Sequence, residues 1–119
     1  MALNRKPTTE EMLLIDFLVN NASVIFPSEW KDNLMVRNMD DGRMGSLHLY
    51  NSTKMINGKK FGKQVSEFEF LDEDGVVVIA SLNVDENGNL FELDIWKTDF
   101  SKLIKLPNKY PIKQIKEKR

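Results

Sequence analysis

Alternation of apolar and polar residues in the second half of the chain constrains the fold more than any other feature. In LFELDIWK, residues 90–97, Leu93 and Ile95 alternate with Asp94 and Trp96. Successive side chains of a strand point to opposite sides of its sheet, so this pattern predicts a strand with one buried and one polar side. We expect strands at residues 34–39, 46–50, 63–71, 76–84 and 89–97.

The elements before and between these strands indicate the fold class. Most connections are short, which favours antiparallel neighbours in sequence order. Thr8 and Glu11 match a capping box, and the apolar stripe that follows predicts a helix ending near Asn20 and Asn21. We therefore expect an α+β fold, with an N-terminal helix packed on one face of a roughly five-stranded antiparallel meander sheet.

Length and composition bound the class of protein. The 119 residues are 41% apolar and predict a single domain over 1–119, with a core at about 7–106 and a basic C-terminal segment at 102–119. The absence of cysteine excludes disulfides and thiolate chemistry. The longest apolar run, VVVIA, is too short to cross a bilayer, and the first residues lack the apolar core of a secretory signal. We expect a cytoplasmic protein without membrane contact.

The turns predict how the last three strands pair. A two-residue type I′ turn at Asn87-Gly88 sorts apolar from polar residues. It pairs Val84 with Phe91, Leu82 with Leu93, Ala80 with Ile95, Asn83 with Glu92, Ser81 with Asp94, and Ile79 with Trp96. A three-residue loop with Gly75 in the left-handed conformation keeps charge out of the core of the preceding hairpin. It pairs Phe70 with Val78, Phe68 with Ala80, Ser66 with Leu82, Glu67 with Ser81, and Glu69 with Ile79.

These registers predict one polar side, opposite the helix, on three adjacent strands. It carries Glu67, Glu69, Ser81, Asn83, Glu92, Asp94 and Trp96. It is interpreted as an ordinary solvated sheet face, as a face neutralised by the basic C-terminal segment, or as a binding site for a cationic protein. On the last hypothesis the candidate site residues are Glu67, Glu69, Glu92, Asp94 and Trp96, with the aromatic ring as anchor.

The C-terminal segment suggests an alternative class of partner. Residues 102–119 contain seven basic residues and one acidic residue, whereas the rest of the chain has 10 basic and 17 acidic residues. Such a segment can bind nucleic acid, or it can lie on its own acidic body. Its apolar residues, which a free tail does not need, favour the second interpretation and make nucleic acid the lesser alternative.

Few residues point to catalysis. His48 is the single histidine, so no set of histidines can hold a metal, and we expect no metal and no cofactor. A small carboxylate-based enzyme would need Glu92, Asp94 and His48 to converge, and without that evidence we assign no catalytic residue.

The end of the last predicted strand, WKTDFS, indicates a structural terminus. Lys97 falls on the apolar side, where its ammonium is expected to reach solvent at the sheet edge. Asp99 is expected to cap a turn with the help of Ser101. Phe100 and Leu103 are expected to return to the core.

Two segments resemble a family of short, uncharacterised bacterial proteins, a domain of unknown function with D-G-x-M-G-S and E-L-D-x-W-K-x-D-F-S segments. The matching residues are Asp41, Gly42, Met44, Gly45, Ser46, Glu92, Leu93, Asp94, Trp96, Lys97, Asp99, Phe100 and Ser101. The chain departs from the pattern at Lys102, where proline is expected. The resemblance implies no activity and leaves the function open. From the acidic side of the sheet we expect a non-enzymatic protein-binding module, with an immunity-like role by analogy of size and charge.

Overall fold

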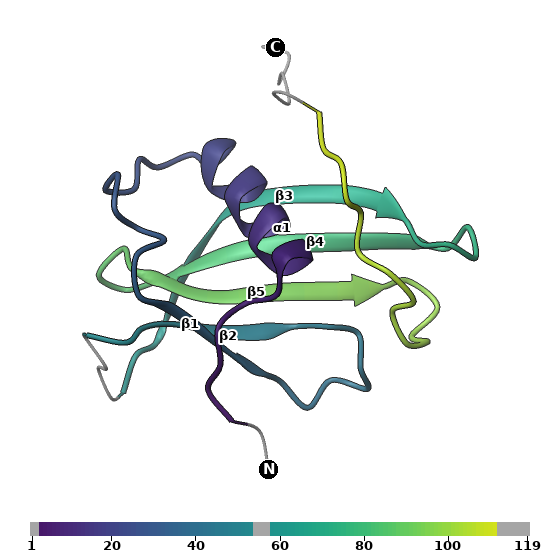
Figure 1. The fold of residues 1–119 in the computed structure, drawn as a ribbon, viewed down its shortest axis with the longest axis horizontal. Helices are drawn as coiled ribbons and strands as arrows, with labels where there is room; N and C mark the ends of the chain where they lie inside the picture. The colour runs from purple at the N-terminus through teal and green to yellow at the C-terminus, as the bar shows by residue number, and fades with distance from the viewer. Residues whose placement is uncertain (1–2, 54–57, 112–119) are drawn as a thin grey trace.

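The fold is one helix on one side of a five-stranded antiparallel sheet (Figure 1). The computed structural model describes residues 3–53 and 58–111. The elements are α1 (Thr9–Asn20), β1 (Leu34–Asn38), β2 (Leu47–Asn51), β3 (Phe61–Leu71), β4 (Val77–Asp85) and β5 (Leu90–Lys97). The α+β class is confirmed. The described residues contain no helix long and apolar enough to span a membrane.

Side chains fix the start of α1, as the capping box predicts. Thr8 Oγ1 accepts a hydrogen bond from the Glu11 N–H at 3.1 Å, and Glu11 Oε1 accepts one from the Thr8 N–H at 2.8 Å. Glu11 Oε1 also lies 2.8 Å from the Arg5 guanidinium. Arg5 pairs through its backbone with Val36 of β1. The cap therefore ties the beginning of the helix to the sheet.

The core lies between α1 and the sheet. Phe17 of α1 meets Phe68 of β3 edge-on, with 4.7 Å between ring centroids. The fully buried side chains on this side belong to Leu14, Ile15, Leu18, Val36, Leu47, Val78, Ala80, Leu82 and Leu93. Apolar burial on one side of the sheet is therefore continuous across all its central strands.

The strand order corrects the predicted meander. The order is β1-β2-β5-β4-β3, so β2 pairs with β5 and not with β3. The connection between β2 and β3 is long enough to carry the chain to the far edge, which short hairpin loops cannot do. This places β3, with its exposed Lys63, Glu67 and Glu69, at an edge, where charges oppose pairing with other chains.

The predicted pairing of β3 with β4 is confirmed, and that of β4 with β5 is confirmed except at its end. Gly75 has φ 81° in the three-residue loop, and Glu67 pairs with Ser81. The type I′ turn is wrong. The Asp85 N–H donates to Asn89 O at 2.9 Å and Gly88 has φ 85°, which closes a second three-residue loop. A bulge after Asn83 compensates, so Val84 faces Leu90 rather than Phe91, while Leu82 still pairs with Leu93.

The segment DGRMGS, residues 41–46, supplies side chains where β5 lacks a backbone neighbour. Asp41 accepts hydrogen bonds from the N–H groups of Met44 and Ser46 at 3.2 and 2.9 Å. The Ile95 N–H donates to Ser46 Oγ at 2.8 Å, and the Lys97 N–H donates to Met44 Sδ at 3.4 Å. Gly42 and Gly45 have positive φ, as expected for a turn. These contacts extend the pairing of β5 beyond the first residue of β2, Leu47.

Residues 102–111 of the C-terminal segment run over the same side of the sheet as α1 (Figure 1). Leu103, Leu106 and Tyr110 pack against the core, and the Tyr110 ring stacks on Phe17 at 5.1 Å. The interpretation in which this segment neutralises the polar side is therefore wrong for residues 102–111. The remaining basic residues of the segment, at 113, 116, 118 and 119, lie outside the described residues.

Lys97 and its partner Asp72 hold the beginning of this segment in place. The Lys97 ammonium is buried, contrary to the prediction that it reaches solvent. Its side chain is 1% exposed, and Nζ donates to Asp72 Oδ2 at 2.8 Å, Asp74 Oδ2 at 2.7 Å and Lys102 O at 3.1 Å. Asp72 also accepts the N–H groups of Ile104 and Lys105 at 2.7 and 3.0 Å. Two carboxylates and a carbonyl accept hydrogen bonds from the ammonium, so the Lys97 side chain can be buried instead of extending to solvent.

Removing the Asp72 carboxylate should destabilise the protein and release the backbone of Ile104 and Lys105. Asp72→Ala leaves a buried ammonium short of a partner and should lower the free energy of unfolding by about 3 kcal/mol or more in urea titrations. The amides of Ile104 and Lys105 should exchange faster with solvent. Asp74→Ala is the control, because the Asp74 side chain is 38% exposed and should contribute less. Equal losses in the two variants would contradict this assignment.

The same carboxylate predicts a dependence of stability on pH. Burial raises the pKa of Asp72. Hydrogen bonds from the Ile104 N–H and the Lys97 ammonium outweigh this effect and lower the pKa to about 2, from a usual 3.8. A carboxyl group whose pKa is lower in the folded than in the unfolded protein stabilises the fold at pH values above its unfolded-state pKa. This contribution is lost as the pH falls toward 2. The urea midpoint of the wild type should therefore fall between pH 4 and pH 2, and more steeply than that of Asp72→Asn. Parallel curves would count against the low pKa.

Candidate functional site

The five residues of the candidate site lie on one side of the sheet, opposite α1. We call Glu67, Glu69, Glu92, Asp94 and Trp96 the acidic face. Strand pairing sets them in rows across β3, β4 and β5. Glu67, Ser81 and Asp94 form one row, and Glu69, Ile79 and Trp96 form the next. The structure therefore brings together residues that lie up to 29 positions apart in the chain.

The members of the acidic face differ in exposure. Glu67 and Glu69 are exposed on the edge strand, and Trp96 is 45% exposed. Glu92 and Asp94 are half-buried in the central strand β5. A partner can therefore reach two carboxylates and an indole directly, while the two inner carboxylates contribute mainly through their charge.

Phe100 joins the site, which the sequence analysis did not predict. Its ring is 71% exposed and lies 6.0 Å from the Trp96 ring, rather than in the core. Phe100 has φ 65°, a left-handed conformation that is uncommon for a non-glycine residue. Asp99 caps the turn as expected, accepting the Ser101 N–H at 3.0 Å. Leu103 packs against the core, as expected. The left-handed residue reverses the chain and leaves the Phe100 ring beside Trp96.

A polar row crosses the inner part of this side. Asn83 Nδ2 donates to Asp94 Oδ2 at 2.9 Å, and His48 Nδ1 lies 4.0 Å from Glu92 Oε2. Burial, together with the charge of Asp94, raises the pKa of Glu92. Burial and the charge of Arg37 lower the pKa of His48, against a smaller opposing effect of Asp94. Both shifts favour the uncharged form of the group concerned.

The geometry limits what chemistry this row can perform. His48 and Glu92 are neighbours, but the 4.0 Å between Nδ1 and Oε2 is too long for a hydrogen bond through which a proton could pass. Their side chains stand on a sheet face rather than around a substrate-sized hollow with convergent groups. Within residues 3–53 and 58–111, no group of three or more His, Cys, Asp or Glu residues could hold a metal ion. The arrangement suits binding better than catalysis.

Comparison with known proteins gives a family and no activity. A family model described as Domain of unknown function (DUF6984) matches residues 4–107. The match includes the helix, all five strands and the beginning of the C-terminal segment. No curated protein and no solved structure matches the chain.

The charges around His48 predict its titration. The chain has one histidine, so its imidazole signal in a proton NMR spectrum is unambiguous. Its pKa should lie below 6.5 in the wild type. Asp94→Asn removes a negative charge and should lower the pKa further, whereas Arg37→Gln removes a positive charge and should raise it. Shifts of the opposite sign in either variant would contradict the described row.

Proposed function

We propose a function from the surface of the molecule, because the chain belongs to a family whose description, Domain of unknown function (DUF6984), names no activity. The proposal is that the protein is a non-enzymatic binding module that receives a basic protein on the acidic face. A bacterial origin and a cytoplasmic location are part of this proposal. So is an immunity-like role, in which the module blocks a basic toxin, by analogy of size and acidity.

The observation that carries the proposal is the exposed aromatic pair beside carboxylates. Trp96 and Phe100 are 45% and 71% exposed, and their rings contact each other. Large aromatic side chains dominate the energy of protein interfaces when a partner removes them from water. Leu71, at the end of β3, is also 66% exposed and lies on the same side of that strand as Glu69. An apolar center with an acidic border is the composition expected of such an interface.

Charge supports a basic partner over a neutral one. Glu67, Glu69, Glu92 and Asp94 lie within three adjacent strands, and carboxylates so arranged attract a cationic surface and speed its encounter. The basic residues of 102–111 lie on the other side of the sheet, with the segment that packs beside α1. The part of the C-terminal segment that the structure describes therefore leaves the acidic face open to a partner.

The test compares variants of the acidic face with matched variants elsewhere. Tagged wild type should capture a basic protein from cells of its own source. Trp96→Ala should weaken the affinity for the purified partner at least tenfold, because truncating an aromatic anchor costs about 2 kcal/mol or more. Glu69→Gln should weaken it less and reduce its dependence on salt.

Two controls remove similar groups from other surfaces. Ile25→Ala truncates an apolar side chain that is 98% exposed, and Glu10→Gln neutralises an exposed carboxylate in the first turn of α1. Both should bind as the wild type does. The proposal fails if all four variants capture the partner equally, or if the partner that depends on Trp96 is acidic.

A further inference from the structure

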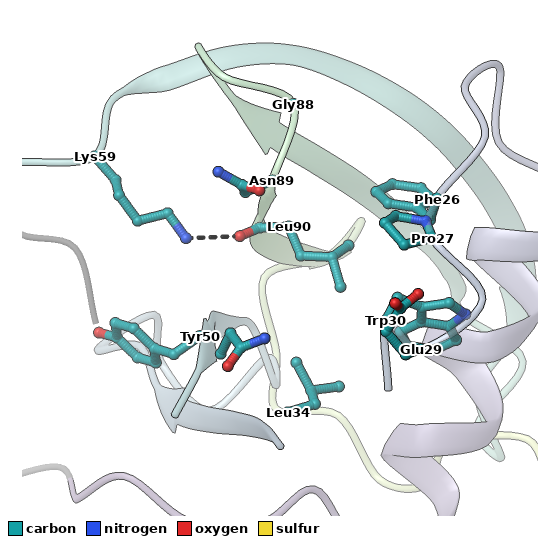
Figure 2. Close-up of a pocket in the computed structure, with 11 residues that line it drawn as sticks. Phe26, Pro27, Glu29, Trp30, Leu34, Tyr50, Lys59, Gly88, Asn89 and Leu90 are labelled. Carbon is teal, nitrogen blue, oxygen red and sulfur yellow. Dashed lines mark hydrogen bonds between the residues drawn. The ribbon is translucent and has the colours of Figure 1, made fainter. Parts of the chain in front are cut away.

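A second site lies at one end of the sheet, away from the acidic face. A hollow of about 200 Å³ opens where the connection from α1 to β1 meets the ends of β2 and β5 (Figure 2). It is smaller than the ~300–1,000 Å³ of sites that take drug-sized ligands, which suits a ligand with a single ring. Its lining residues are Phe26, Pro27, Glu29, Trp30, Leu34, Tyr50, Asn51, Lys59, Gly88, Asn89 and Leu90.

One wall of the hollow is apolar and continuous with the core. Phe26, Trp30 and Leu90 are partly buried and pack against the core, and Leu34 is buried. Figure 2 shows Phe26, Pro27 and Trp30 together on one side, with Leu90 and Leu34 extending between them and the opposite wall. An aromatic ring placed here contacts aromatic and branched side chains on several sides.

The opposite wall carries an ammonium group. The Lys59 side chain is 13% exposed, and its Nζ donates to Leu90 O at 2.8 Å and lies 3.8 Å from Asp85 Oδ2 (Figure 2). An ammonium has three N–H groups. Within the described residues, Lys59 Nζ has one hydrogen-bond acceptor, one more distant carboxylate, and the Phe91 ring with its centroid 5.9 Å away. Burial lowers the pKa of Lys59, and Asp85 only partly offsets this effect. The ammonium is therefore desolvated and can gain from a second anionic contact.

Two amide side chains, those of Asn51 and Asn89, also line the hollow. Asn51 Oδ1 accepts hydrogen bonds from Thr53, which leaves its NH₂ group able to donate to a ligand. Asn89 lines the hollow beside Leu90. Glu29, the acidic residue of the lining, lies on the far side with Trp30 (Figure 2). The Lys59 ammonium and the Asn89 amide thus lie across the hollow from the aromatic wall (Figure 2).

We propose that this hollow binds a small aromatic carboxylate, with its ring against Trp30, Phe26 and Leu90 and its carboxylate on Lys59 Nζ. The polarity of the two walls sets this orientation, since the reverse one brings the carboxylate to Glu29. The site shares no residue with the acidic face. It therefore stands or falls independently of the proposed protein binding.

Three probes of one shape test the proposal on the wild-type protein. Phenylacetate, phenylacetamide and 2-phenylethylamine carry the same ring and differ in the charge of the tail. Titrated in two-dimensional NMR spectra, phenylacetate should shift the indole N–H signal of Trp30 and the amide signals of Asn89 and Leu90. The Trp96 indole should not move. The amide should bind about tenfold more weakly, and the amine more weakly still.

Two lysine variants locate the charge. Lys59→Met should reduce phenylacetate affinity to that of phenylacetamide for the wild type, and Lys60→Met, at the adjacent exposed residue, should leave it unchanged. The proposal is overturned if phenylacetate shifts no signal of the lining residues at high millimolar concentration. Equal affinity for all three probes, or an equal loss in both variants, also overturns it. The probe series on the wild type holds even if Lys59→Met does not fold.

Discussion

The buried ammonium of Lys97 decides which side of the sheet the end of the chain covers. Burying a charge is costly unless hydrogen bonds and opposite charges surround it. Here the Asp72 carboxylate accepts from Lys97 Nζ and from the backbone of Ile104 and Lys105. One carboxylate therefore satisfies the charge and fixes the course of the following residues. Residues 102–111 are thereby directed over the apolar side and do not cover the acidic face.

The parts of the fold that follow from local periodicity could be predicted from the sequence. The capping box of α1 needs two side chains three residues apart, and the structure has both of its hydrogen bonds. Alternation along β3, β4 and β5 placed Leu82 and Leu93 on one side and Asp94 and Trp96 on the other. A register that errs by one residue would bury these charges, so patterning and turn length constrain each other. Hence the side of the sheet on which each of these residues lies could be predicted for three strands.

Features set by distant contacts could not be predicted in this way. No local signal says that β2 lies beside β5, because the long connection to β3 permits either neighbour. The two carboxylates that accept from Lys97 come from a turn 23 to 25 residues earlier, so sequence spacing alone suggested an exposed ammonium. Phe100 adopts a left-handed conformation that its residue type disfavours. The hollow beside Lys59 gathers residues from five separate stretches of chain, and none of them carries a recognisable motif.

The junction between β2 and β5 has a consequence for how the domain comes apart. Backbone pairing joins them only at Leu47 with Leu93 and His48 with Glu92, and the Ser46 hydroxyl extends the contact to the N–H and C=O of Ile95. The β1–β2 hairpin and the β3–β4–β5 unit are each paired along a greater length. The β2–β5 junction is thus the shortest backbone pairing in the sheet, and the Ser46 hydroxyl lengthens it. We therefore expect the sheet to open first along this junction.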